Sequence, residues 1–431
     1  MHRTADSIAE VVTSGLCIGC GLCETVTQGR IPMVMTPTGS LRPTPVERFS
    51  PEEEAAVLTA CPGVVAAPRQ TPDLKADPVW GAFSTMRYGW AGDSKVRFRA
   101  ATGGVLTALG MHLIDAGTVD TVLHVGADPK YPMRSHWVLS QTAEEVLANT
   151  GSRYGPTAPL AGLGPVLDRA EPFAVIAKPC DQGALHAYAA SDPRVDDLCV
   201  ARLAMVCGGQ SRLERSVDML AELGVDEDEV SLFRYRGHGN PGPTRVETTD
   251  GRSFEWTYLE MWEDEAGWKV ETRCKFCPDA LGEAADIAAA DVWPGGAPTG
   301  DDEGFNGIIV RTPTGEALVR SAVEAGALVL GKPIGPREFD DLQPHQVRKK
   351  ESLASRLAGL AEAGSPTINT TGLRVDFLGR RLNPEARLAE QAGTLRRATE
   401  GRFTEPLPAP PNRSAQRPHL TCGSCCRTAE I

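Results

Sequence analysis

Several features that define other protein classes are missing from this 431-residue chain. It contains no run of about 18 or more apolar residues, so we expect no membrane-spanning helix. No apolar stretch follows the first residues, so we expect no secretory signal. The chain has fewer positive than negative residues, with 44 Lys and Arg and 56 Asp and Glu. A nucleic-acid partner would select a basic face, so we expect no such partner. No Gly-x-Gly-x-x-Gly run follows a predicted strand, which argues against a Rossmann site and direct use of NAD(P)H.

The rest of the composition is that of an ordinary globular protein, with 41 % hydrophobic and 23 % charged residues. The length allows two or three domains. Twelve cysteines without a secretory signal indicate metal ligation in a reducing compartment rather than disulfides. We therefore expect a cytoplasmic protein whose cysteines bind metal.

The most specific motif is a triple cysteine run near the N-terminus. Cys17, Cys20 and Cys23 have the CxxCxxC spacing with which a tight loop places three thiolates around a cubane iron–sulfur cluster. Gly19 and Gly21 allow the backbone to curl closely enough to aim its amides at the cluster. The run therefore predicts three ligands of a [4Fe–4S] cluster.

The fourth ligand must come from elsewhere in the chain. A two-cluster ferredoxin would continue the run with a further cysteine at the position of Thr27, so this run does not build a second cluster. Cys61, in a Cys-Pro pair, can complete the first. A structural zinc also takes four thiolates, but it usually takes them from two separated CxxC pairs, so the spacing favours iron–sulfur.

A second set of four cysteines lies at predicted strand or loop ends. By spacing alone these residues can form another [4Fe–4S] site, a CxxC redox pair, or small core residues. Cys199 lies in a predicted strand, and we interpret it as a core thiol. Three further thiols in the C-terminal tail lack a fourth ligand, and scavenged metal, redox chemistry or no function are all open for them. The second set is Cys180, Cys207, Cys274 and Cys277, and the tail thiols are Cys422, Cys425 and Cys426.

Patterning along the chain predicts four regions. Residues 1–75 form a ferredoxin-like domain with a hairpin over 33–42 and a helix capped by Ser50; residues 62–82 read as a linker. Residues 83–345 form an α/β body, because β-branched runs alternate with helical patterns. The runs at 121–125, 173–177 and 307–311 predict strands, and those at 104–114 and 213–223 predict helices. Residues 346–404 predict a helical segment, and residues 405–431 a Pro-rich flexible tail.

Taken in order, ten motifs between about residue 15 and residue 350 resemble the coenzyme F420 hydrogenase/dehydrogenase beta-subunit family. That family includes 7-hydroxymethyl chlorophyll a reductase and the ferredoxin-type divinyl chlorophyllide vinyl reductases. The motifs are Cys17-Ile-Gly-Cys-Gly-Leu-Cys, Cys61-Pro-Gly, Ala101-Thr-Gly-Gly, Gly151-Ser-Arg-Tyr, Lys178-Pro-Cys, Cys207-Gly-Gly, Phe233-Arg-Tyr-Arg-Gly-His-Gly-Asn-Pro-Gly, Cys274-Lys-Phe-Cys-Pro-Asp, Ala290-Asp-Val-Trp and Gly307-Ile-Ile-Val-Arg.

The resemblance implies a flavin-binding body that holds FAD beside iron–sulfur, and it strengthens the second [4Fe–4S] site. It says little about residues 351–431. One departure is Gln182, where we expect an apolar residue, and which can matter for flavin or substrate contacts.

Three segments are candidates for the FAD site that the resemblance implies. Thr102, Gly103 and Gly104 open a helix and leave free N–H groups for a phosphate or a ring oxygen, although such a turn is more often simple helix punctuation. The loop at 151–157 offers a cation, hydroxyls and an aromatic face, or is an ordinary surface turn; its candidates are Ser152, Arg153 and Tyr154. Lys178 can place a positive charge beside the flavin and so act in catalysis, or form an inert ion pair.

The best acid–base candidate is His238, because an imidazole can donate a proton near neutral pH; a structural loop histidine is the plainer interpretation. His124, His136 and His186 have no context that raises them above background. Asp279 and Asp291 can hydrogen-bond around a cluster or cap a turn.

These observations predict an FAD- and iron–sulfur-dependent oxidoreductase. Electrons would come from ferredoxin or a similar carrier, and hydride would leave for an unsaturated or cyclic organic substrate. One alternative is hydride exchange between FAD and coenzyme F420. Others are an electron-transfer subunit of a larger complex and a redox sensor. The sequence leaves a homo-oligomer open.

Overall fold

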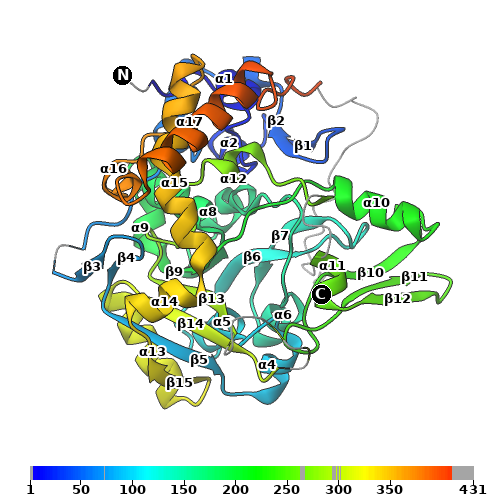
Figure 1. Ribbon diagram of the computed structural model, residues 1–431. Coiled ribbons are helices and arrows are strands. Elements are labelled where there is room, and N and C mark those ends of the chain that lie inside the picture. Colours follow the sequence, from blue (N-terminus) through cyan, green and yellow to red (C-terminus); the bar gives the residue numbers. More distant parts are fainter. Residues whose placement is uncertain are drawn as a thin grey trace, which may run out of the picture.

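The computed structural model describes residues 3–71, 73–262, 267–293, 298, 300 and 302–409 (Figure 1). Cys422, Cys425 and Cys426 lie outside the described residues. Over the described ranges, no helix combines the length and the apolar character that crossing a membrane requires.

A mixed sheet of eight strands forms the centre of the molecule (Figure 1). Its four middle strands β6, β8, β9 and β13 are parallel, and the strands on either side are antiparallel. Since parallel strands end at the same edge, the loops that follow the four middle strands lie together. The sheet order is β15 (Leu328–Pro333), β5 (Thr85–Ala91), β14 (Phe305–Val310), β13 (Ile287–Val292), β9 (Cys199–Met205), β8 (Phe173–Ala177), β6 (Thr121–Ala127) and β7 (Ser135–Ser140).

Both faces of this sheet are covered, as its continuous apolar strands require. In β8, Phe173 and Val175 join the core on one face, while Ala174 joins the core on the other. The α/β prediction is therefore confirmed, and so are the three predicted strands and the helix at 104–114, which is α5. One face carries α5 (Val105–Asp115) and α13 (Pro313–Glu324), and the other carries α7 (Leu163–Leu167), α8 (Pro179–Tyr188) and α9 (Arg194–Leu198).

The N-terminal residues form a small module of short elements. The predicted hairpin is present as the antiparallel pair β1–β2. The predicted capping box is present too: the Ser50 hydroxyl accepts from the Glu53 amide, and the Glu53 carboxylate accepts from the Ser50 amide. The elements are α1 (Ile8–Thr13), α2 (Leu22–Val26), β1 (Met33–Met35), β2 (Leu41–Pro43) and α3 (Pro51–Ala60).

Residues 62–82 are more than a linker. They contain β3 (Lys75–Asp77), which pairs with β4 (Gly81–Phe83). Trp80, between the two strands, is fully buried, and its ring lies 4.5 Å from that of Phe339 on α14 (Pro336–Leu342). The apolar aromatic side chain fixes this segment to the body, a contact that proline and glycine content alone did not indicate.

A second, three-stranded sheet projects from one side of the body (Figure 1). It packs with α10, which confirms the helix predicted at 213–223. The remaining short helices lie between larger elements. The sheet is β10 (Val230–Arg234), β11 (Thr244–Thr248) and β12 (Ser253–Trp256), and the helices are α4 (Ser94–Arg99), α6 (Ala143–Ala148), α10 (Glu214–Glu222), α11 (Tyr258–Trp262) and α12 (Thr272–Lys275).

Three further helices run from the body to the N-terminal module: α15 (Pro344–Glu362), α16 (Val375–Gly379) and α17 (Pro384–Thr399) (Figure 1). Two buried ion pairs attach this segment to the body, because Lys350 and Arg374 both contact the fully buried carboxylate of Glu283. Leu357 and Phe403 pack in the same core as Cys61. The helical prediction for residues 346–404 agrees with this, while the division into separate domains stays a prediction.

Candidate iron–sulfur and flavin site

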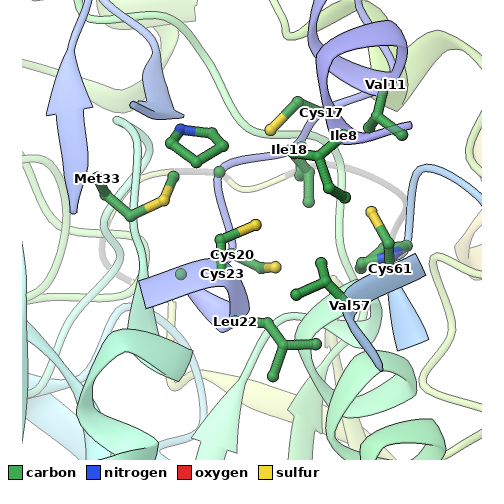
Figure 2. A pocket seen from close by; sticks show the side chains of 14 residues that line it. Ile8, Val11, Cys17, Ile18, Cys20, Leu22, Cys23, Met33, Val57 and Cys61 are labelled. Carbon is green, nitrogen blue, oxygen red and sulfur yellow. The ribbon is translucent and has the colours of Figure 1, made fainter. Parts of the chain in front are cut away.

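Cys17, Cys20, Cys23 and Cys61 line one cavity (Figure 2). The cavity encloses about 360 Å³ of space free of protein atoms, part of which opens to solvent. The rest of its lining is apolar, including Ile8, Val11, Ile18, Leu22, Met33 and Val57. Four convergent thiols in an apolar shell form the donor set that holds a cubane cluster, so the residues fit the group that the sequence predicts.

The loop that carries the first three cysteines is shaped by two glycines. Gly19 and Gly21 have φ values of +72° and +91°, a left-handed conformation that side chains disfavour. A Cβ on Gly21 would stand 2.5 Å from the Ala161 amide nitrogen, so the loop lies directly against the body. The carbonyl of Cys20 also accepts a hydrogen bond from the Leu160 amide at 3.0 Å. The predicted role of both glycines agrees with this geometry.

The second set of four cysteines also lines one cavity, of about 340 Å³. Cys180 lies in the first turn of α8, directly after β8, and Cys207 follows β9. Cys274 is on α12, and Cys277 follows it. The site therefore lies where the middle strands of the sheet end. That edge is where open α/β sheets bind ligands.

The two cavities are adjacent. Ile18, between the first two cysteines of the N-terminal run, lines both of them. Gln210 connects their walls: its side-chain amide donates to the Ile18 carbonyl at 3.1 Å, and its backbone N–H donates to the Cys274 sulfur at 3.3 Å. Sequence reasoning missed Gln210, because nothing local marks it as a neighbour of residues almost two hundred positions away.

Burial governs the electrostatics of these thiols. It raises the pKa of Cys20 and Cys180 well above the usual value, and that of Cys61 and Cys274 to about 12. Backbone N–H groups directed at the sulfur act in the opposite direction, as for the Gln210 amide and Cys274. Amide donors of this kind stabilise thiolates and tune cluster potentials. Within the described ranges, no three His, Cys, Asp or Glu side chains form a group that could hold a single metal ion.

A buried arginine lies beside the first site. Arg42 has no exposed side-chain surface and lies near Cys17. It donates to Glu271 at 2.7 Å and to both carboxylate oxygens of Glu405 at 2.8 Å. Glu271 directly precedes α12, so one guanidinium joins the N-terminal module, the second site and the C-terminal segment.

The predicted flavin residues Thr102, Gly103 and Gly104 lie at the start of α5. The Thr102 hydroxyl donates to Asp291 at 2.7 Å. Gly103 is held tightly by protein, because a Cβ there would stand 2.7 Å from the side-chain oxygen of Asn306. The same oxygen accepts from the Val105 amide, so this turn is packed against strand β14.

The loop at 151–157 meets this turn through an unpredicted residue, Arg236. Its guanidinium donates to Asp291 at 2.7 Å, to the Tyr154 hydroxyl at 3.1 Å and to the Thr102 hydroxyl at 3.2 Å. Its Nε is buried and has no hydrogen-bond partner among the described residues. An orphaned donor beside an aromatic ring and a hydroxyl fits a polar ligand such as a flavin. Arg236 lies in the motif that also contains His238, and the sequence pattern indicated only the histidine as a candidate functional residue.

Two neighbours of Tyr154 in the sequence are placed differently. Arg153 donates to the hydroxyl of Ser135 and to four backbone carbonyls. Its guanidinium is therefore occupied by protein, and a phosphate would have to displace these bonds. Ser152 is half-buried.

Lys178 lines the second cysteine cavity. It pairs with the buried carboxylate of Asp181 at 2.7 Å and donates to the Thr157 hydroxyl. Burial is the largest single effect and lowers the pKa of Lys178, but the charge and hydrogen bond of Asp181, together with the charges of Cys180 and Cys207, raise that pKa by more in total, so the ammonium stays protonated. The ion pair that the sequence analysis considered for this lysine is present, and its role beside a flavin stays a prediction.

Several other predicted positions have structural roles. Gln182 is buried and donates to the carbonyls of Val175 and Leu203, which explains a polar residue there without a ligand. Asp279 accepts from two backbone amides and caps its turn, and it also lines the second cavity. Cys199 is half-buried against the core, as predicted.

His238 is exposed on the loop between β10 and β11, with its ring 5.9 Å from that of Phe98. Partial desolvation and the positive charges of Arg234 and Arg99 lower its pKa. It does not line either cysteine cavity. Its role as a proton donor stays a prediction.

Two family models match this chain. Residues 86–163 match the N-terminal part, and residues 170–334 the C-terminal part, of the coenzyme F420 hydrogenase/dehydrogenase beta subunit. Together they cover more than half of the chain. The chain belongs to the coenzyme F420 hydrogenase/dehydrogenase beta-subunit family. The resemblance inferred from the motifs is thereby confirmed.

Curated relatives of this family member are remote. It is 24 % identical over 338 residues to a coenzyme F420-dependent sulfite reductase of Methanocaldococcus jannaschii, covering 73 % of this chain but only 47 % of the reductase. The chain thus spans about half the length of that relative. It is 23 % identical to one of the subunits of the F(420)H(2) dehydrogenase of Methanosarcina mazei (74 % and 86 % covered) and 23 % identical to the beta subunit of the coenzyme F420 hydrogenase of Methanothermobacter thermautotrophicus (67 % and 99 % covered).

A solved structure shares the fold. It is a chain of the F420-reducing [NiFe] hydrogenase complex of Methanosarcina barkeri, with a TM-score of 0.53 and 19 % identity, covering 69 % of this chain and 99 % of that one. This similarity concerns the fold alone. The family models end at residue 334, so α14 to α17 lie outside the matched ranges.

Proposed function

We propose that this protein is an iron–sulfur flavoprotein oxidoreductase that moves electrons between a carrier protein and an organic hydride acceptor. The observation that carries the proposal is the convergence of eight cysteines, drawn from five parts of the chain, into two adjacent cavities. Thiols that serve only as small core residues have no reason to gather four at a time.

The cysteine ligands are assigned by cavity. Cys17, Cys20, Cys23 and Cys61 would hold one [4Fe–4S] cluster, and Cys180, Cys207, Cys274 and Cys277 the other. When bound, such clusters carry single electrons, and FAD exchanges these for hydride. Ile18 places an apolar side chain in the wall between the sites, and Gln210 connects the Ile18 carbonyl to the Cys274 sulfur through two hydrogen bonds.

The flavin position is inferred from polar groups at the same sheet edge. Thr102, Tyr154, Arg236 and Asp291 form one hydrogen-bonded group, and Lys178 places an ammonium in the wall of the second cysteine cavity. A positive charge at that position would favour an anionic reduced flavin. Ferredoxin or a similar carrier stays the proposed electron donor, and an unsaturated or cyclic molecule the proposed acceptor.

Anaerobic purification tests this proposal directly. We expect about eight iron atoms and eight sulfides per chain, together with one extractable FAD. Zinc in place of iron, or a colourless preparation, would refute it. Four iron atoms would remove one of the two assignments.

Coenzyme F420 is a second candidate for the hydride partner, and the names of the relatives favour it. Mixing the protein with reduced F420 under anaerobic conditions distinguishes F420 from an organic hydride acceptor. Rapid bleaching of the bound flavin supports F420. A flavin that stays oxidised, but is reduced by ferredoxin, supports the organic acceptor.

A further inference from the structure

The C-terminal helices carry a charge opposite to that of the whole protein. The chain has a net charge of −12, yet residues 344–404 contain eleven Lys and Arg against six Asp and Glu, a net charge of +5. This segment lies beyond the residues that match the family models. Its charge is therefore a property of this chain that the family match does not explain.

Some of these positively charged residues lie near the turn between Cys274 and Cys277. Lys275, between the two cysteines, is exposed. Arg356 of α15 donates to the Lys275 carbonyl at 3.2 Å, and the Lys275 ammonium lies 6.0 Å from the ring centre of Phe403. Arg212 and Arg397 lie close enough for their charges to act on the Lys275 ammonium, and α17, which carries Arg397, packs against α15.

We call Arg212, Lys275, Arg356 and Arg397 the basic patch. Arg356 forms an ion pair with Glu390 at 2.9 Å. For Lys275, Arg212 and Arg397, the part of the chain that the structure describes provides no carboxylate at ion-pair distance. Lys275 is exposed and Arg212 and Arg397 are half-buried, so no ion pair neutralises the positive charge of these three side chains.

The basic patch lies where the second cysteine site comes closest to solvent. All four cysteines of the second site are half-buried, whereas in the first site only Cys17 is half-buried and the other three cysteines are buried. Two turns before Arg356 on α15, Lys349 lines the second cavity and donates to the Gly208 carbonyl at 2.9 Å. Cations thus flank the exposed side of this site.

We propose that the basic patch is the docking surface for an acidic electron-carrier protein. The proposal rests on the function proposed above, because it needs a redox site behind the patch. Complementary charge accelerates encounter and fixes orientation, and the negative remainder of the chain repels an acidic carrier elsewhere. The net charge of the whole chain alone favours the opposite partner, a basic carrier attracted to an acidic protein. The location of the positive residues, rather than the net charge, therefore determines the charge expected of the carrier.

Binding of a purified, acidic bacterial-type ferredoxin to the full-length holoprotein tests this proposal. We expect a dissociation constant that rises steeply with salt, because surface charges are screened. The double variant Lys275→Glu/Arg397→Glu should weaken binding at least tenfold at low salt. Arg397→Glu alone, on α17 and far in the sequence from Cys274 and Cys277, should also weaken it.

The matched control reverses two other exposed cations, Lys95→Glu/Arg320→Glu, on α4 and α13 at the opposite end of the molecule from α17 (Figure 1). It changes the net charge equally and should leave the dissociation constant within threefold of the wild-type value. Equal weakening by both double variants, salt-independent binding, or tighter binding of a basic cytochrome would overturn the docking proposal. Iron and flavin analysis of the same preparations reports on the proposed function separately.

Discussion

Replacing Arg42 by methionine should destabilise the N-terminal module strongly. The substitution removes the hydrogen bonds to Glu271 and Glu405 and leaves two carboxylates, whose side chains are 0 % and 9 % exposed, without a counter-charge. Breaking a buried ion pair by removing one partner costs about 3–5 kcal/mol. Each 1.4 kcal/mol is about tenfold in an equilibrium constant, so we expect amides of α1 and α12 to exchange with solvent more than about a hundredfold faster.

Hydrogen exchange followed by mass spectrometry measures this effect. Adding Glu271→Gln and Glu405→Gln to the Arg42→Met background should restore most of the protection, because neutral amides no longer need the guanidinium. Arg245 provides the control: it also contacts two glutamates, Glu247 and Glu255, but it lies at the surface, so Arg245→Met should leave exchange unchanged. Exchange in Arg42→Met within threefold of the wild-type rate would refute the reasoning.

Three further predictions follow from buried groups. Cys274→Ala should lower the iron content from about eight to about four atoms per chain, whereas Cys199→Ala should leave it unchanged, as metal analysis will show. Gln182→Leu should destabilise the body by about 2 kcal/mol in denaturant unfolding, because the Val175 and Leu203 carbonyls lose their donor. Burial, and to a smaller extent the charge of His136, lowers the pKa of His124 to about 4. The contribution of His124 to the free energy of unfolding is therefore complete above the unfolded pKa of about 6.5 and is lost as the pH falls. At pH 5 the loss is about 2 kcal/mol. His124→Gln should flatten that dependence of unfolding free energy on pH, and an equally steep variant would contradict it.

The sequence predicted the parts of the site whose chemistry is local. CxxCxxC spacing and a Cys-Pro pair indicated the four cysteines that line the first cavity, while the second set was left open by its spacing and was strengthened by the family resemblance. β-branched runs indicated the strands β6, β8 and β14 for the same local reason. The overall α/β architecture followed from their alternation with helical patterns.

The residues that join distant segments could not be predicted in this way. Arg42, Gln210 and Arg236 lie in ordinary local contexts, and their partners are separated from them by as many as 363 positions. Only the tertiary fold determines which polar side chain faces which. The same holds for Lys275: its position between two cysteines was visible, but the cations of α15 and α17 around it were not.

The contact between Arg42 and Glu405 can form only late in the synthesis of the protein. The thiols of Cys17, Cys20 and Cys23 leave the ribosome well before Glu405, whose carboxylate contacts Arg42 and follows Cys23 by 382 residues (405 − 23). At about 5–20 residues per second, the nascent chain exposes those thiols for roughly 20–80 s before the closing residue is available. Factors that shield cysteines from oxidants, or that would deliver iron under the proposed function, therefore have a defined interval in which to reach the incomplete module.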